Sequence, residues 1–294
     1  MARIHRIDDA SVRASRKRIE RSARLLPPLP RGSSYEPVSA GGVPAVWVCA
    51  PGVAAPGTAA GPTPGALLYL HGGAYAAGSP RAYRDLCVRL SAALGLPALV
   101  LDYRLAPECP VPAALHDAQA AWHWLLASGV RPSGSVFAGD SAGGGLALAL
   151  ALLLRHEQMP LPACALLMSP WTDLSASGDS IRANADSDAY LSPQQLEPVA
   201  RAYLAGADPR DPLASPLFGE LGGMPPLCIH YSEYELLADD SRRLAARAGE
   251  AGVDVSLTGW PGLPHAFQIF APMLPEARAS LRAMAAFARA TIDR

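Results

Sequence analysis

A serine lies at the centre of a glycine-rich turn, Gly139-Asp140-Ser141-Ala142-Gly143, between a short apolar run and a long one. The preceding run, residues 136–138, is typical of a strand, and the following run, residues 146–154, is typical of a helix. Glycines two residues on either side of a serine let the backbone turn sharply enough to raise the hydroxyl above a sheet. This nucleophile-elbow pattern predicts that Ser141 attacks a carbonyl carbon, although five residues alone also fit an ordinary glycine-rich turn.

A serine nucleophile needs a base, and the sequence offers one histidine in a suitable place. With this elbow, the catalytic groups follow the chain order serine, acid, histidine. His265 lies in the loop Trp260-Pro261-Gly262-Leu263-Pro264-His265, directly after the last expected strand, and is the predicted base. Other histidines fall in the N-terminal arm, on expected helices or inside an expected strand: His5, His116, His123, His156 and His230.

The acid that orients the histidine should lie on the loop after the expected strand at residues 227–231. Glu235 is the predicted acid, because the strand has ended there and the next helix has not begun. Asp239 and Asp240 are more simply explained as first-turn acids that the helix dipole favours. The sequence leaves Asp239, Asp240 and Glu233 open as alternatives.

Hydrogen-bond donors for the oxyanion are expected from two turns. The first is His71-Gly72-Gly73-Ala74-Tyr75, where bare backbone after an apolar run could approach a substrate carbonyl. The second is the elbow, where the residue after the nucleophile supplies its amide. The backbone amides of Gly72, Gly73 and Ala142 are therefore the predicted oxyanion donors.

Apolar runs alternate with helical patterns, which predicts an α/β fold with a mostly parallel eight-stranded sheet and helices on both faces. The expected strands are residues 35–38, 43–49, 66–70, 98–101, 136–138, 164–168, 227–231 and 253–257, the first two antiparallel. The expected helices are residues 82–93, 113–127, 142–156, 193–204, 236–251 and 275–290. Strand ends and short loops would then bring the serine, acid and histidine to one edge.

One long segment interrupts the alternation and predicts a small helical cap. Residues 175–224 stand between two consecutive strands, where a lid over an active site would be built. We expect residues 1–40 to form N-terminal cap helices, residues 41–174 and 225–294 the core, and residues 175–224 the cap insertion.

Composition narrows the function class. Half of the residues are apolar and the formal charge is −1, which gives no general attraction to nucleic acid. The first 31 residues nevertheless carry nine basic groups against three acidic ones, as expected of a membrane-surface or nucleic-acid arm, or of a helix docked on an acidic body. The docked helix is the favoured interpretation. No run suits stable membrane insertion or a signal peptide, and five scattered cysteines favour a reducing cytoplasm.

Five segments together resemble the bacterial hormone-sensitive-lipase-like esterases, an α/β-hydrolase family. They are residues 71–75, 102–108, 139–144, 169–174 and 261–265, and the resemblance runs from about residue 66 to the C-terminus. The acetyl-hydrolase and lactone-hydrolase-like branch is the most similar. The resemblance implies Ser141, Glu235 and His265 as the triad, with Gly72, Gly73 and Ala142 around the oxyanion. Two positions depart from the family pattern: Ala74 replaces a third glycine, and Glu235 replaces an aspartate.

We therefore expect a cytoplasmic serine carboxylesterase without cofactor or metal, which acts on small-molecule esters with short to medium acyl chains, acetyl esters and lactones included. An amidase, formamidase or peptidase with the same triad is an alternative, as is a non-catalytic ligand receptor on this fold. Pairing of the edge strand at residues 253–257 would give a homodimer. Arg104 and Glu108 are expected to form a buried ion pair, and Asp140 to hold the elbow.

Overall fold

The computed structural model describes residues 9–57 and 64–292. In these residues one sheet of eight strands has the order β1-β2-β4-β3-β5-β6-β7-β8. Its strands are β1 (Ser34–Ala40), β2 (Val43–Cys49), β3 (Leu67–Leu70), β4 (Ala98–Leu101), β5 (Val136–Asp140), β6 (Cys164–Met168), β7 (Leu227–Ser232) and β8 (Val255–Trp260). β2 pairs antiparallel with both β1 and β4, and every other pairing is parallel. The predicted mostly parallel eight-stranded sheet is confirmed.

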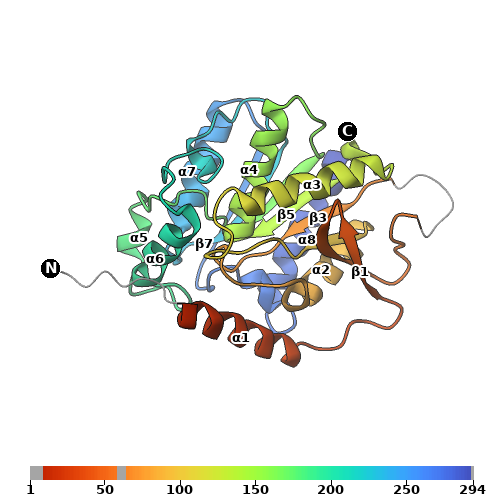
Figure 1. The fold of residues 1–294 in the computed structure, drawn as a ribbon, viewed down its shortest axis with the longest axis horizontal. Helices are drawn as coiled ribbons and strands as arrows, with labels where there is room; N and C mark the ends of the chain where they lie inside the picture. Colours follow the sequence, from red (N-terminus) through yellow and green to blue (C-terminus); the bar gives the residue numbers. More distant parts are fainter. Residues whose placement is uncertain (1–8, 58–63, 293–294) are drawn as a thin grey trace.

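Helices cover both faces of this sheet (Figure 1). One apolar cluster joins the sheet to α3 (Ala113–Ala127), α4 (Ala142–His156) and α7 (Ala238–Glu250). A second cluster on the other face joins it to α2 (Pro80–Leu94) and α8 (Pro275–Ile292). Because the central strands are buried on both faces, β3, β5 and β6 consist almost wholly of apolar residues and glycine.

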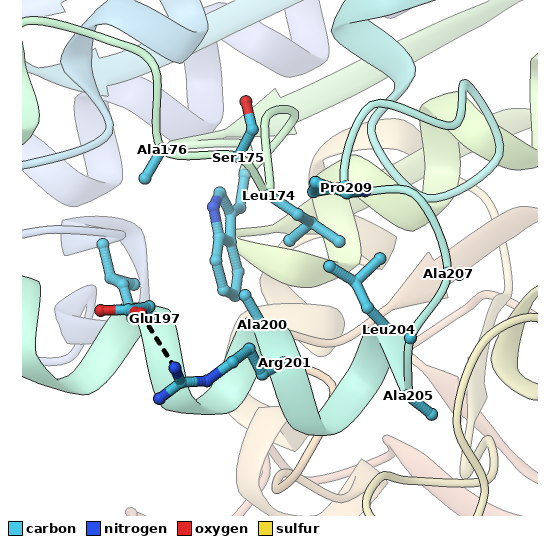
Figure 2. A pocket seen from close by; sticks show the side chains of 13 residues that line it. Leu174, Ser175, Ala176, Glu197, Ala200, Arg201, Leu204, Ala205, Ala207 and Pro209 are labelled. Atoms are coloured by element: carbon cyan, nitrogen blue, oxygen red, sulfur yellow. Dashed lines mark hydrogen bonds and ion pairs between the residues drawn. The ribbon is translucent and has the colours of Figure 1, made fainter. Parts of the chain in front are cut away.

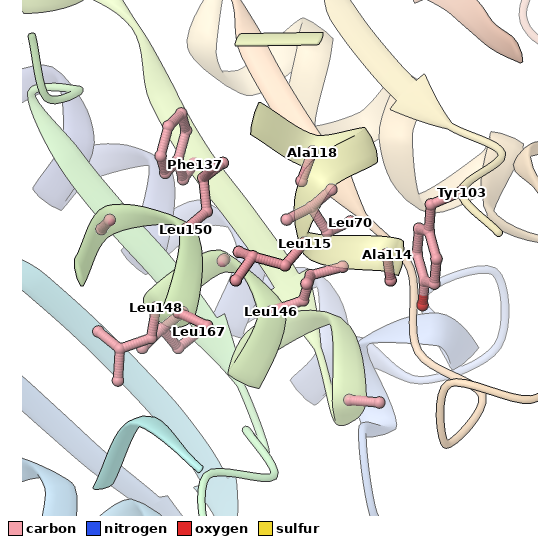
Figure 3. Close-up of a cluster of buried hydrophobic side chains, with 14 of the residues drawn as sticks. Leu70, Tyr103, Ala114, Leu115, Ala118, Phe137, Leu146, Leu148, Leu150 and Leu167 are labelled. Carbon is pink, nitrogen blue, oxygen red and sulfur yellow. The ribbon is translucent and has the colours of Figure 1, made fainter. Parts of the chain in front are cut away.

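The core around α4 explains why this helix is rich in small residues at its start. Figure 3 shows Leu146 and Leu150 of α4 packing with Leu115 of α3 and Phe137 of β5. At the N-terminal end α4 approaches β3 so closely that a Cβ on Gly143 would lie 2.0 Å from the Leu70 carbonyl oxygen. The glycines of the elbow therefore let α4 begin directly above the strand ends.

Helices outside these two layers lie at the N-terminus and between β6 and β7. In Figure 1, α1 (Asp9–Leu25) runs along the lower edge, beyond the sheet and its covering helices. The segment between β6 and β7 contains α5 (Ser180–Ala183), α6 (Pro193–Leu204) and a short 3₁₀ turn at Pro216–Phe218. No helix in the described ranges has the length and apolar character needed to cross a membrane.

Most expected elements match within two residues, and α3, α4 and α6 match at both ends. The last strand is displaced: it spans Val255–Trp260 rather than residues 253–257. The Val253 N–H donates to the Ala248 carbonyl at 2.9 Å, and Gly252 adopts a φ of 80°. Val253 therefore closes the end of α7 and is unavailable to the strand.

The expected pair between Arg104 and Glu108 is wrong. Arg104 instead pairs with Asp117 of α3 at 2.7 Å, and Asp117 also accepts the Arg104 backbone N–H. Glu108 pairs at 2.7 Å with Arg16 of α1, far away in the sequence. Neither pair is fully buried, because 54% of the Arg104 side chain and 60% of the Glu108 side chain are exposed.

Candidate active site

Ser141 occupies the turn between β5 and α4 in a strained conformation. Its φ is 52° and its ψ is −124°, a region that a residue with a Cβ rarely adopts. Two backbone bonds of 2.9 Å hold the turn, from Ser141 N–H to the Met168 carbonyl and from Trp171 N–H to the Ser141 carbonyl. A Cβ on Gly139 would lie 2.3 Å from the Gly143 carbonyl oxygen. The fold thus requires the glycine at this position of the elbow.

The structure brings His265 and Glu235 together in the interior. His265 Nδ1 lies 3.0 Å from Glu235 Oε2, and the two side chains are almost completely buried. The residue after the histidine, Ala266, has a φ of 49° and donates its N–H to Ser169 Oγ, which fixes the loop. His265 Nε2 has no hydrogen-bond partner in the described part of the chain. This nitrogen remains available to a reacting hydroxyl.

The other three acids considered from the sequence are engaged elsewhere or exposed. Asp239 accepts the Ser180 N–H at 2.8 Å, whereas Asp240 accepts the backbone N–H groups of Thr172 and Asp173. Burial raises the pKa of Asp240 to about 7. Glu233 lies on the surface. Within the described residues, Glu235 is the only one of the four whose carboxylate bonds to His265.

Electrostatics around His265 favour a charged imidazole. Burial by itself would lower the pKa of His265, but the charge of Glu235 and its hydrogen bond outweigh burial and raise the pKa above 6.5. Asp188 and Asp140 act in the same direction. A histidine that becomes protonated during a reaction is therefore stabilised here.

The glycine-rich loop after β3 is fixed by Asp140, the residue before the candidate nucleophile. Asp140 Oδ1 accepts the Gly72 N–H at 2.8 Å and the Tyr69 hydroxyl at 2.7 Å, while Oδ2 accepts the Tyr83 hydroxyl at 3.0 Å. The Gly72 N–H, which was expected to bind the oxyanion, therefore already donates its hydrogen bond to this carboxylate. Asp140 joins the loop to the elbow instead of holding the elbow alone.

The next residues of the same loop leave backbone amides free. Gly73 has a φ of 118° and Ala74 a φ of 56°, so the chain turns outward after Gly72. In the described residues no hydrogen bond is recorded from the N–H groups of Gly73, Ala74 or Ala142. Ala142 is the first residue of α4, where N–H groups have no partner within the helix. A free Ala74 amide could not be expected from the sequence, because it depends on which amide donates to Asp140.

Two further contacts, one from α6 and one from α1, support this loop. The ring of Tyr75 stacks on Tyr203 of α6 with centroids 3.8 Å apart. From α1, Arg16 donates to the carbonyls of Ala76 at 2.7 Å and Ala106 at 2.9 Å. The role of Arg16 was not found from the sequence, where it is one of many basic residues in the first helix.

The buried histidine of the loop is not a second base. His71 stacks on Tyr103 with ring centroids 4.3 Å apart and on Tyr83 at 5.6 Å. Its Nδ1 lies 2.8 Å from the Gly72 carbonyl oxygen. Burial lowers the pKa of His71 to about 4, so this imidazole is neutral near pH 7.

The segment between β6 and β7 contacts the acid loop directly. Asp188 Oδ2 accepts the Leu236 N–H at 2.8 Å, and Asn184 Nδ2 donates to the Glu235 carbonyl at 2.8 Å. Near this junction the ring of Tyr190 lies 6.2 Å from that of His265. The loop that presents Glu235 is therefore supported by the inserted segment.

A cavity of about 540 Å³ lies between α6 and the segment that follows β6. Figure 2 shows Leu174, Ala200 and Leu204 around it, with Glu197 and Arg201 paired at its rim. Ser141 and His265 do not line it, but Trp171, whose N–H holds the Ser141 carbonyl, does. The cavity thus adjoins the catalytic region without enclosing it.

Donors suited to a metal do not gather in this region or elsewhere in the described ranges. No group of three or more His, Cys, Asp or Glu side chains there could hold a metal ion. All five cysteines are free thiols, and four of them are buried.

Sheet order, elbow position and a histidine after the last strand define a hydrolase of the α/β-hydrolase class. The sequence profile of the alpha/beta hydrolase fold matches residues 67–269, and the chain belongs to this family. An acetyl-hydrolase of Streptomyces hygroscopicus is 46% identical over 223 residues, which are 76% of this chain and 75% of that protein.

Solved structures place the chain more closely. It is 41% identical to an esterase of the bacterial hormone-sensitive lipase family, with a TM-score of 0.90 over 96% of this chain and 92% of that one. EstE5, whose crystals were soaked with p-nitrophenyl butyrate, is 37% identical, with a TM-score of 0.89 over 100% of this chain and 95% of that one. The protein is therefore an esterase of the bacterial hormone-sensitive-lipase-like family, as the sequence motifs predicted.

Proposed function

We propose that the chain is a serine carboxylesterase in which Ser141 is the nucleophile, His265 the general base and Glu235 the acid that orients it. One observation carries this proposal: His265 is held through Nδ1 by a buried carboxylate at 3.0 Å, while its Nε2 has no partner in the described residues. The strained φ of Ser141 is a second support, because backbone strain at a serine is typical of a nucleophile elbow.

Acylation follows from these roles. Ser141 Oγ attacks the ester carbonyl carbon while its proton passes to His265 Nε2, and the resulting imidazolium is stabilised by Glu235. Collapse of the tetrahedral intermediate breaks the bond to the alcohol oxygen, which leaves with the proton from Nε2. In the second half, His265 takes a proton from water, hydroxide adds to the acyl-serine, and the acid departs as Ser141 recovers its proton.

For the oxyanion we propose the amides of Gly73, Ala74 and Ala142. Ala74 takes the place of Gly72, because the Gly72 N–H already donates to Asp140. Removal of one such donor typically costs about 3–4 kcal/mol of transition-state stabilisation. The Asp140 carboxylate thus sets the geometry of the loop after β3 and does not itself bind the substrate.

We propose that α1 and the inserted residues 175–224 form a cap over this site. Asp188 and Asn184 bind the acid loop, Tyr190 lies beside His265, and Tyr203 of α6 stacks on Tyr75. Each contact joins the cap to a loop that carries a catalytic group. The cap would therefore set the space for the acyl and alcohol parts of the ester.

Short to medium acyl chains are the proposed substrates, with acetyl esters and lactones among them. The support comes from similarity to an acetyl-hydrolase and to an esterase soaked with a butyrate ester. We further propose a cytoplasmic location, which the five free cysteines favour, and a homodimer paired through the edge strand β8.

The test is hydrolysis of p-nitrophenyl esters from acetate to decanoate by the wild type and by Ser141→Ala. We expect the wild type to prefer short and medium chains and to cleave a matched anilide far more slowly. Ser141→Ala should lose nearly all activity, whereas Ser22→Ala, an exposed serine of α1, should retain it. Full activity of Ser141→Ala would remove Ser141 from the mechanism.

A further inference from the structure

The basic residues of α1 separate into an inward and an outward set. Val12 and Ala23 are buried against the body, and Arg16 on the same side reaches the carbonyls of Ala76 and Ala106. The outward side, within the helical segment 17–24, carries only basic side chains among its charged residues, all of them exposed: Lys17, Arg18, Arg21 and Arg24. Figure 1 shows this helix at the edge of the molecule, with its outer side unobstructed in that view.

These four basic side chains are exposed to solvent. For the described residues, no ion pair or side-chain hydrogen bond is recorded from Lys17, Arg18, Arg21 or Arg24. The acid within this stretch, Glu20, instead accepts a hydrogen bond from the Ser79 hydroxyl. The sequence favoured docking of this helix on an acidic body. That interpretation explains the ion pair of Arg16 with Glu108, but it does not explain the four basic residues of the outward set.

One member of the outward set, Arg18, acts electrostatically on Tyr190 of the inserted segment. Burial raises the pKa of Tyr190, and the charge of Arg18 partly offsets that rise, as expected if Arg18 lies near the tyrosine. Tyr190 in turn lies 6.2 Å from His265 and 6.5 Å from Phe270. α1 is therefore joined to the oxyanion loop through Arg16, while Arg18 acts on the inserted segment that approaches His265.

Large apolar side chains are exposed at the end of α1 and in the segments near His265. Leu25, the last residue of α1, is 87% exposed, Tyr190 is 53% exposed and Met273 is 70% exposed. The Met273 N–H donates to the carbonyl of Phe270, which contacts Tyr190. After Leu25 the chain continues without charge to Pro30.

We propose that the outward face of α1 binds an anionic lipid surface and thereby holds the protein against a membrane. Four exposed cations match the negative headgroups, and the exposed Leu25 at the end of α1 suits the boundary between headgroups and acyl chains. A nucleic acid would be expected to use aromatic stacking as well, and α1 has no aromatic residue. Binding is peripheral and reversible, because the apolar side of α1 is already buried against the protein.

The experiment is cosedimentation with vesicles of phosphatidylglycerol and phosphatidylcholine, compared with vesicles of phosphatidylcholine alone. We expect binding only to the anionic vesicles at about 50 mM salt, and its loss at about 500 mM salt, where charges are screened within a few ångströms. Since one basic residue near an anionic surface contributes about fivefold, Arg21→Glu should lower the partition coefficient at least about fivefold and Lys17→Glu/Arg21→Glu about 25-fold. Arg282→Glu, the same charge change on the exposed side of α8, should retain binding.

Each variant is also assayed on soluble p-nitrophenyl acetate, where we expect wild-type kcat/KM. This assay shows that the variants are folded and separates failure of lipid binding from failure of the esterase mechanism. Equal binding to neutral vesicles, or retention of binding by Lys17→Glu/Arg21→Glu, would overturn the proposal. Binding to single-stranded DNA but not to anionic vesicles would also overturn it.

Discussion

The carboxylate of Asp140 accepts the Gly72 N–H at 2.8 Å and so joins the nucleophile turn to the oxyanion loop. The same carboxylate accepts hydrogen bonds from the hydroxyl groups of Tyr69 and Tyr83, so both of its oxygens are bonded in the interior. A Cβ on Gly72 would lie 2.2 Å from Asp140 Oδ2, which leaves no space for another residue. The position of the proposed donors Gly73 and Ala74 therefore depends on a side chain that does not contact the substrate.

Asp140→Ala should lower kcat about 100-fold with a smaller change in KM, because the oxyanion donors would lose their position. Asp140→Asn should recover most of the loss, since its amide oxygen can still accept the Gly72 N–H. Steady-state kinetics on p-nitrophenyl butyrate measures both. Buried donors left unpaired in the alanine variant cost about 1–3 kcal/mol each, so its folding is checked by thermal denaturation. Equal loss in both variants would contradict a role in positioning the loop.

Glu235→Gln should change both the rate and its pH dependence. The free enzyme needs neutral His265, so kcat/KM falls as pH drops through the His265 pKa, which lies above 6.5 in the wild type. Without the glutamate charge this pKa falls, and the acid limb of the profile should move to lower pH while the maximum drops about 10²–10⁴-fold. His71 and His230 cannot produce this limb, because burial holds the pKa of each at about 4.

An acid limb that stays in place in Glu235→Gln would show that another group titrates. Asp239→Asn serves as the matched control, because Asp239 follows Glu235 closely in the sequence but lies in the first turn of α7 and bonds to Ser180. We expect the pH profile of this control to match that of the wild type.

Arg16→Met should lower kcat about tenfold through loss of support for the oxyanion loop. Two hydrogen bonds to the carbonyls of Ala76 and Ala106 disappear, and the free energy of unfolding should fall by about 1–2 kcal/mol. The ion pair with Glu108 contributes little, because that carboxylate is largely exposed. Glu108→Gln should therefore keep most of the stability and activity, as measured by urea unfolding and by ester hydrolysis. The opposite ranking of the two variants would contradict this assignment.

His230→Asn should weaken the dependence of stability on pH. In the folded protein burial lowers the pKa of His230 from 6.5 to about 4, so the unfolded chain binds a proton first. Neutral His230 therefore contributes up to about 3 kcal/mol to the free energy of unfolding above pH 6.5, and this contribution is lost as the pH falls toward 4. The asparagine amide can replace the imidazole as hydrogen-bond partner of the Ser280 hydroxyl. Urea unfolding at pH 7.5 and pH 5 should show a smaller loss in the variant than in the wild type.

Local sequence patterns were sufficient for the elements and for the elbow. The turn at Ser141 and the loop at His265 are both defined by neighbouring glycines and prolines and by the strands before them. The sequence favoured Glu235 because it lies before the helix but left Asp239, Asp240 and Glu233 open, and the 3.0 Å contact with His265 identifies Glu235 as the partner. Side-chain direction, and not sequence position, makes that choice.

Contacts between distant segments could not be predicted. Asp140 at the end of β5 accepts the Gly72 N–H from the loop after the neighbouring strand β3. Arg16 donates to a loop about 60 residues away in the sequence. The expected pair of Arg104 and Glu108 failed for a related reason. Both residues lie on one loop, but Asp117 on the first turns of α3 is closer to the guanidinium, and α1 approaches Glu108.

The most direct test of the mechanism is covalent labelling of the folded protein with a fluorophosphonate, followed by intact mass measurement and peptide mapping. We expect one adduct per chain, on the peptide that contains Ser141, with loss of ester hydrolysis in proportion to labelling. Ser141→Ala should remain unlabelled, and His265→Ala should label far more slowly. An active wild type with no adduct on Ser141, or an adduct on another serine that abolishes activity, would contradict Ser141 as the nucleophile.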